Sequence, residues 1–146
     1  MTVRVQAAAF DTGAELNAFV KDRTDVGAVV SFTGVVRDTD GTLHQMEIEH
    51  YPGMTERAIA EIVTQVQSRW ALADVLVIHR HGILAVGAPI MMVATASAHR
   101  ADAFAAADYL MDYLKSRAPF WKKETTADGT AWVAPKDEDE AALKRW

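Results

Sequence analysis

One stretch without a charged residue, residues 83–98, constrains the fold most strongly. Its sixteen residues are fewer than the ~20 that a membrane-spanning helix needs, and they include Gly87 and Pro89. Apolar and β-branched residues bounded by turn residues are typical of buried strands. We therefore expect this stretch to form buried sheet with a turn inside it.

Several other segments have the pattern of β-strands. The valine-rich residues 26–36 predict a largely buried strand, in which Gly34 marks a bulge or the close approach of a backbone or ligand. After a turn at Asp40-Gly41, residues 43–51 alternate between apolar and polar side chains, as in a half-exposed antiparallel strand. We also expect strands at residues 3–5, a strand pair at 75–79 and 90–96, and a hairpin over 120–133 that turns at Asp128-Gly129.

Four segments have helical periodicity or capping signals. Thr12 and Glu15 form a possible capping box before a helix whose inner face is Leu16, Phe19 and Val20. A longer helix follows Thr55, and the terminal residues 137–146 can form a short one. A second long helix begins near His99 and stops before Pro119, and we expect its covered side to be Phe104, Ala107, Leu110, Met111, Leu114 and Ala118.

These elements mix without strict strand-helix alternation, which indicates an α+β fold. We expect a mixed or antiparallel sheet packed by two long helices, with a small C-terminal hairpin and helix. A length of 146 residues fits one domain, residues 1–146.

Composition excludes several classes of function. The chain has no cysteine, which rules out disulfides, thiolate metal sites and a cysteine nucleophile. The formal net charge of −5 argues against a general nucleic-acid binder. The sequence starts without a signal-peptide pattern, so we expect a cytoplasmic protein that is not bound to a membrane.

Four groups of residues are candidates for chemistry. His99 and Arg100 stand where a buried strand passes into a helix, and a helix N-terminus favours phosphate or carboxylate. Lys115 lies at the edge of the apolar stripe of that helix, where burial lowers a lysine pKa. Lys115, Arg117, Lys122 and Lys123 surround two aromatic residues at a chain reversal, and Arg37 ends the strand that carries Phe32 and Gly34.

Each candidate also has an ordinary structural explanation. His99 and Arg100 would then be solvated at a strand end, and Lys115 would pair with Asp112 one turn earlier. The cations near Pro119 would complement the C-terminus of the helix, and Arg37 would be merely exposed. His79 and His81 can share a strand face, but two imidazoles do not define a metal site, so we expect neither a metal nor a cofactor.

Five motifs in order resemble the large, catalytic subunit of the molybdopterin synthase family, over almost the whole chain. They are GAVVSFTGVVR (27–37), EHYPGMTE (49–56), HRHG (79–82), SAHR (97–100) and YLKSRAPFWKKE (113–124). Each is weak alone, and the long final string carries most of the resemblance. The resemblance implies an α/β hammerhead-like fold.

The resemblance also implies an activity and its partners. The family converts cyclic pyranopterin monophosphate into molybdopterin by installing the dithiolene sulfurs. The sulfur arrives as a thiocarboxylate on the C-terminal Gly-Gly of a small ubiquitin-like subunit. Two large subunits form a central dimer, and one small subunit at each end completes a heterotetramer.

Site roles carry over by motif position. The resemblance implies that Lys115 and Lys122 are catalytic. It assigns substrate binding to the same two lysines and to Phe32, Val35, Val36, Arg37, His99, Arg100, Lys123, Glu124 and, near the neighbouring subunit's pocket, Lys136.

Two other readings of these residues stay open at this stage. In the first, a non-enzymatic α+β module uses the basic pocket to bind a phosphorylated metabolite or nucleotide, and it needs no channel for a Gly-Gly tail. In the second, Phe120, Trp121 and nearby lysines stack on single-stranded RNA.

Overall fold

The computed structural model describes residues 1–38, 41–134 and 136–146. The predicted turn at Asp40-Gly41 includes a residue outside these ranges. The strands are β1 (Thr2–Gln6), β2 (Ala28–Val35), β3 (Leu43–His50), β4 (Asp74–Arg80), β5 (Gly82–Ala85), β6 (Pro89–Ser97), β7 (Phe120–Thr126) and β8 (Gly129–Trp132). The helices are α1 (Thr12–Val20), α2 (Met54–Arg69), α3 (Arg100–Arg117) and α4 (Asp137–Ala142), and a 3-10 turn, Leu143–Arg145, follows.

The larger sheet has the strand order β1-β4-β6-β2. β1 pairs with β4 in parallel, whereas β6 is antiparallel to both β4 and β2, so the predicted mixed sheet is confirmed. The uncharged stretch divides between two sheets, because β5 joins the smaller sheet and β6 lies inside the larger one. The register of β2 against β6 shifts between Gly34 and Val35, so Gly34 does mark a bulge.

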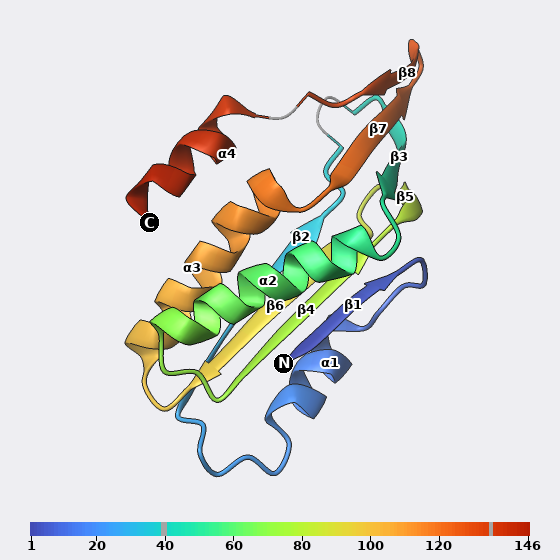
Figure 1. The fold of residues 1–146 in the computed structure, drawn as a ribbon. Coiled ribbons are helices and arrows are strands. Elements are labelled where there is room, and N and C mark those ends of the chain that lie inside the picture. Colours follow the sequence, from blue (N-terminus) through green and yellow to red (C-terminus); the bar gives the residue numbers. More distant parts are fainter. Residues whose placement is uncertain (39–40, 135) are drawn as a thin grey trace.

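Helices cover both faces of the larger sheet (Figure 1). α2 and α3 lie on one face, where Val77 and Val93 belong to the main core. On the other face, Leu16 and Phe19 of α1 pack against Ile78 and Met92. Because β4 and β6 are covered on both sides, their side chains are apolar in both directions.

α3 approaches the sheet through small residues, and one expectation about it is wrong. Phe104 is 62% exposed, whereas Ala103, Ala106 and Leu110 are fully buried. The helix lies so close to β6 that the Thr95 Oγ1 hydroxyl of this strand donates to the Ala103 carbonyl oxygen at 2.7 Å. Phe104 lies outside this buried stripe of the helix and therefore points outward.

The helix starts also differ from the predicted caps. α1 is capped by Asp11, whose side chain accepts a hydrogen bond from the Ala14 N–H, and not by a Thr12 capping box. α2 begins at Met54, and Glu56 accepts from the Gly53 N–H at 2.7 Å. Thr55 is instead buried, and its hydroxyl exchanges hydrogen bonds with the backbone of Tyr51.

The smaller sheet has the order β5-β3-β7-β8, with all neighbours antiparallel. Met46 and Ile48 on β3 are buried, as their alternation predicts. The predicted C-terminal hairpin is present as β7 and β8. In Figure 1 the hairpin extends beyond the end of α3, whereas α4 runs back alongside α3.

The C-terminal residue fixes the end of the chain against α2 and α3. The Trp146 ring lies edge-on to Trp70 and Tyr109, with centroids 5.6 and 5.4 Å away. Its indole N–H donates to Asp112, which also accepts from Arg145. Asp112 therefore binds the C-terminal residues Arg145 and Trp146. The surface-pair alternative required it to bind Lys115 instead.

Gly27→Ala is expected to destabilise the fold by about 1–3 kcal/mol, the usual cost of overpacking. A Cβ atom at this position would lie 2.2 Å from the backbone oxygen of Ala98. The clash can be relieved only if the backbone shifts. The Gly27 N–H donates to the Ser97 carbonyl oxygen at 2.9 Å, so such a shift strains this hydrogen bond. Urea unfolding measures the loss.

Gly34→Ala is the matched control for this experiment. Its added Cβ would be 3.4 Å from the flexible side chain of Met91 and would meet no backbone atom at shorter distance. We expect its free energy of unfolding to stay much closer to wild type. Equal stability of the two variants would contradict the proposed backbone clash.

Candidate functional site

The site lies where the chain passes from the end of α3 to the start of β7. Lys115 lies in the last turn of α3 and Lys122 is the third residue of β7, and a short reversal through Pro119 joins them. The Phe120 N–H donates to the Ala118 carbonyl oxygen at 2.9 Å, which tightens this reversal. Residues seven apart in the sequence thereby come to one place.

Lys122 is the more enclosed of the two lysines. Its pKa is lowered to about 8, mainly by burial and also by the positive charges of Lys115 and Lys136. Asp139 and Glu124 act in the opposite direction. A lysine with this pKa exchanges its proton readily near neutral pH, which suits proton transfer as well as charge stabilisation.

The inner side of the site contains a histidine on β4. His79 is only 7% exposed, and its ring stacks on Phe120 with centroids 3.7 Å apart and planes 14° apart. Burial is the largest cause that lowers its pKa to about 4, and the charges of Lys122 and Lys115 contribute. His79 is therefore neutral at physiological pH.

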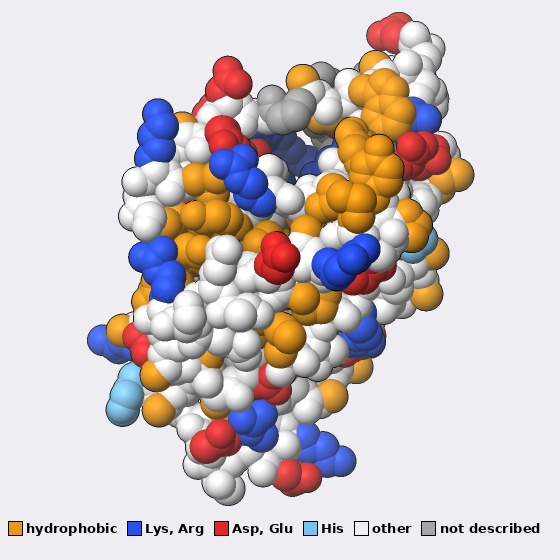
Figure 2. Space-filling model, viewed as in Figure 1, with side chains coloured by type: hydrophobic (Ala, Val, Ile, Leu, Met, Phe, Trp, Pro, Cys, Tyr) orange, Lys and Arg blue, Asp and Glu red, His pale blue; other side chains and the backbone are white. Residues whose placement is uncertain are grey.

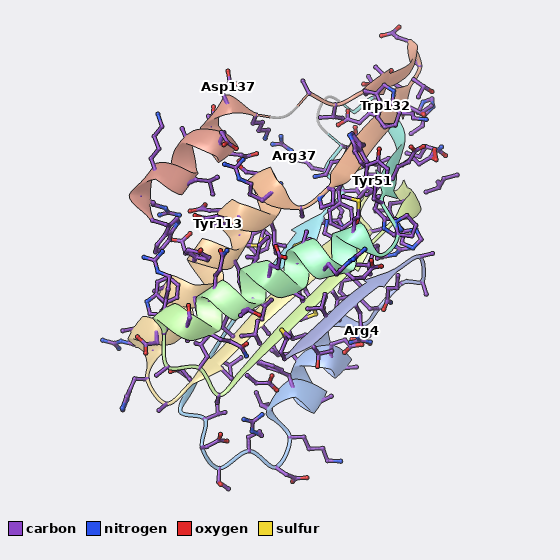
Figure 3. The ribbon with its side chains drawn as sticks, viewed as in Figure 1. Arg4, Arg37, Tyr51, Tyr113, Trp132 and Asp137 are labelled. Carbon is purple, nitrogen blue, oxygen red and sulfur yellow. The ribbon has the colours of Figure 1, made fainter. Side chains whose placement is uncertain are left out.

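Figure 2 shows a hollow between α4 and the β7-β8 hairpin, with Lys or Arg side chains at its floor. Arg37, which follows β2, lies in the same opening in Figure 3, between the labelled Asp137 and Tyr51. It is exposed and available to an anion. Phe32 is on the α3 side of the sheet, because it pairs with the core residue Val93, and it is 43% exposed.

The two valines before Arg37 differ from each other. Val35 is 50% exposed and accessible to a ligand, whereas the Val36 side chain is in the core at 1%. The Val36 N–H donates to Ala88 and its carbonyl accepts from Gly87. The expected contact of Val36 with substrate is therefore not supported by the structure, because both its side chain and its N–H are already used.

His99 and Arg100 are not near the lysines within one chain. His99 caps the N-terminus of α3 and Arg100 is its first residue, and both are exposed. Lys115 lies fifteen residues further along the same helix, a distance of about 22 Å at 1.5 Å per residue. A small molecule cannot touch both ends of α3 in a single copy.

Lys123 points away from Lys122, because successive side chains of a strand alternate. It lies on the outer face, 3.6 Å from Glu49 and 4.4 Å from the centre of the Trp132 ring. Glu124 returns to the Lys122 face. Lys123 thus lies on the opposite face of β7 from Lys122, and its expected contact with substrate stays a prediction.

Lys136 lies near the lysine pair of its own chain. It is the residue before α4, and its charge lowers the pKa of Lys122. The expectation that it reaches a neighbouring subunit's pocket stays a prediction, since it concerns a second copy of the chain.

Two negative findings apply to the described residues only. Among residues 1–38, 41–134 and 136–146, no three His, Cys, Asp or Glu side chains form a group that could hold a metal ion. Within the same ranges, every helix is too short or too polar to cross a membrane.

Acid is expected to destabilise the protein through His79. The folded-state pKa of about 4 lies below the ordinary 6.5, so the unfolded chain binds the proton first as the pH falls through this window. The free energy of unfolding should drop by about 3 kcal/mol from this group between pH 7 and pH 4. Urea unfolding of wild type and His79→Phe at both pH values measures the difference.

His44→Ala serves as the control for the acid experiment, since His44 is exposed. It should retain the wild-type pH dependence, including the part due to carboxylates. If His79→Phe loses as much stability in acid as wild type does, His79 is not the group responsible.

The fold and the lysine pair define a class: an α+β protein with a cationic site suited to an anionic small molecule. Residues 5–117 match the model of the family described as MoaE protein, and the chain belongs to this family. Its role is in molybdopterin biosynthesis, and the expected α+β fold and family membership are confirmed.

Known proteins resemble the chain over its full length. A molybdopterin synthase catalytic subunit of Cereibacter sphaeroides is 65% identical over 146 residues, which is 100% of both chains. The solved MoaE protein of Burkholderia ambifaria is 48% identical, with a TM-score of 0.85 over 99% of this chain and 97% of that one.

A third comparison shows the fold alone. A chain in the structure titled protein-protein complex of subunit 1 and 2 of molybdopterin-converting factor from Helicobacter pylori has a TM-score of 0.80 at 17% identity. The alignment covers 92% of this chain and 91% of that one.

Sequence reasoning missed two members of the site. His79 was considered only as a metal ligand, although the apolar residues before it indicate a buried position. Asp139 belongs to the acidic start of α4, and only the packing of α4 on α3 brings it near Lys122.

Proposed function

We propose that the chain transfers sulfur from the C-terminal thiocarboxylate of a small ubiquitin-like subunit to cyclic pyranopterin monophosphate, forming the dithiolene of molybdopterin. The observation that carries the proposal is that Lys115 and Lys122 lie close enough for their charges to interact, in a chain without cysteine. Such a chain has no thiol of its own, so the sulfur must be delivered.

In the proposed reaction, the thiocarboxylate sulfur attacks the substrate carbon that becomes part of the dithiolene and displaces an oxygen substituent of that carbon. Water then cleaves the acyl–sulfur bond, which leaves the sulfur on the pterin and returns the small subunit as a carboxylate. A second thiocarboxylate supplies the second sulfur in the same way. Lys115 and Lys122 stabilise the negative charge that develops and move protons. Cleavage of the phosphate ester bond then completes ring opening. The lowered pKa of Lys122 supports this double role, since both of its protonation states are populated near pH 8.

A protein partner is supported by the surface beside the hollow. Tyr51, Trp121 and Trp132 are each at least 41% exposed, and together with Glu49 and His50 they line a pocket of about 290 Å³. Exposed aromatic residues of this kind are typical of protein interfaces. The two-subunit complex from Helicobacter pylori, which shares the fold, is consistent with a small-subunit partner.

Substrate anchoring then requires two copies of the chain. Glu124 acts on Lys122, and Arg37 lies in the same opening. Phe32 and Val35 are exposed on the strand that leads to Arg37. If His99 and Arg100 also bind the phosphate, they must come from a second copy, because α3 separates them from Lys115. This favours a homodimer of large subunits and, with two small subunits, a heterotetramer.

The test combines the purified chain with a thiocarboxylated small protein ending in Gly-Gly and the cyclic precursor. We expect a stable complex and a dithiolene product, detected by mass spectrometry of the released pterin. Binding of the precursor without conversion in this complete mixture would overturn the proposal and indicate a metabolite-binding module.

A further inference from the structure

Phe120 connects the two elements that carry the lysines. It is the first residue of β7, five residues after Lys115 and two before Lys122. Side chains two apart on a strand lie on the same face, so the Phe120 ring and the Lys122 side chain point the same way. The position of this ring therefore sets where β7 leaves the end of α3.

His79 holds the Phe120 ring from the larger sheet. The two rings are nearly parallel, with centroids 3.7 Å apart, whereas the His50 ring is 6.3 Å from Phe120. The contact crosses between sheets, since β4 belongs to the larger sheet and β7 to the smaller one. The stack is thus a direct link between the main core and the strand of Lys122.

His79 is itself rigidly placed. Its strand is paired on both sides, with β1 and β6. The ring Nδ1 lies 2.8 Å from the Arg80 carbonyl oxygen, and because a carbonyl only accepts, Nδ1 carries the proton. The Arg80 side chain in turn donates twice to the Ala7 carbonyl oxygen, which closes the end of the strand.

His79 must stay uncharged to hold the Phe120 ring beside the two lysines. Lys115 and Lys122 both act on it electrostatically, and His50 does so as well. A protonated ring would repel both lysines and drive them apart. The buried, singly protonated ring instead supplies a flat apolar surface next to two cations.

We propose that His79 is a positioning residue of the reaction, which holds Phe120 in place and thereby keeps Lys122 next to Lys115. The inference rests on the proposed function for its catalytic meaning, but its structural content can be measured alone. His79 acts through Phe120 and does not touch the reacting atoms.

The experiment follows the titration of Lys122 by NMR in protein labelled with 13C-lysine, with the signal assigned by Lys122→Arg. Wild type should titrate at about 8. In His79→Ala, Phe120 is released and water reaches the amine, so the midpoint should rise by about one unit or more. His79→Phe keeps a flat ring and should restore the wild-type midpoint.

Phe120→Leu tests the same stack from its other side, and it remains informative if His79→Ala does not fold. It should raise the Lys122 midpoint as well. The groups that face Lys122 are unchanged in it: Lys115, Lys136, Asp139 and Glu124. His81→Ala is the matched control, because the His81 ring contacts His50 and should leave Lys122 unaffected.

The outcomes separate this inference from the proposed function. A wild-type midpoint in His79→Ala or Phe120→Leu, or a raised midpoint in His79→Phe, overturns it. In the sulfur-transfer assay, His79→Ala should lower kcat by about tenfold with little change in KM, and His79→Phe should recover it. A raised Lys122 midpoint in a protein that transfers no sulfur supports the positioning role and refutes only the proposed function.

Discussion

Lys122→Ala is expected to lower the rate of dithiolene formation by about 100- to 1,000-fold, the usual cost of removing one charge-stabilising group. The amine of Lys122 is the enclosed member of the lysine pair. The other side chains on that face of β7, Phe120, Glu124 and Thr126, carry no positive charge. The protein should remain folded, because the aliphatic part of the lysine lies at a partly exposed position. Single-turnover assays with a thiocarboxylated partner measure the rate.

Two further variants make this result specific. Lys21→Ala removes an exposed lysine after α1, on the opposite face of the larger sheet, and should retain the wild-type rate. Lys115→Ala should resemble Lys122→Ala. Near-normal turnover of folded Lys122→Ala would remove this residue from the mechanism.

Mixing two inactive variants is expected to restore about a quarter of wild-type activity, if each pocket takes residues from both copies of a symmetric dimer. The variants are Arg100→Ala and Lys115→Ala, which lie at opposite ends of α3. Random pairing makes half of the dimers mixed, and each mixed dimer has one pocket in which both residues are intact. Activity is compared before and after the two proteins are unfolded and refolded together.

A pocket formed within one copy predicts a different activity for the mixed dimers. If Arg100 and Lys115 acted in the same copy, a mixed dimer would contain no intact pocket, and refolding together would restore nothing. Combining Lys122→Ala with Lys115→Ala is the control, because both residues belong to one copy's site and should not complement each other.

Much of the fold follows from local patterns that the sequence displays. The buried strand β6 and the two long helices were predicted because hydrophobic periodicity is set by the secondary structure itself. The meeting of Lys115 and Lys122 was predicted from the short reversal at Pro119, since only seven residues separate them. Both features are determined by residues that lie close together in the sequence.

Other features depend on contacts between distant segments. Phe104 was placed in the core because it is large and apolar, but the buried stripe of α3 runs through Ala103, Ala106 and Leu110 and leaves Phe104 outside it. The assignment of Lys123 came from a motif, whereas strand alternation turns it to the outer face. The role of His79 depends on Phe120, forty-one residues later, and no local pattern connects the two.

The origin of both lysines in one continuous segment has a consequence for chimaeras between relatives. A crossover placed before α3 or after β7 transfers the segment as a unit, together with the proline that sets its reversal. A crossover between residues 116 and 121 would join a helix end from one parent to a strand from another, and the two amines would no longer be matched. His79 should then be exchanged with the same block, because the ring that it supports travels with it.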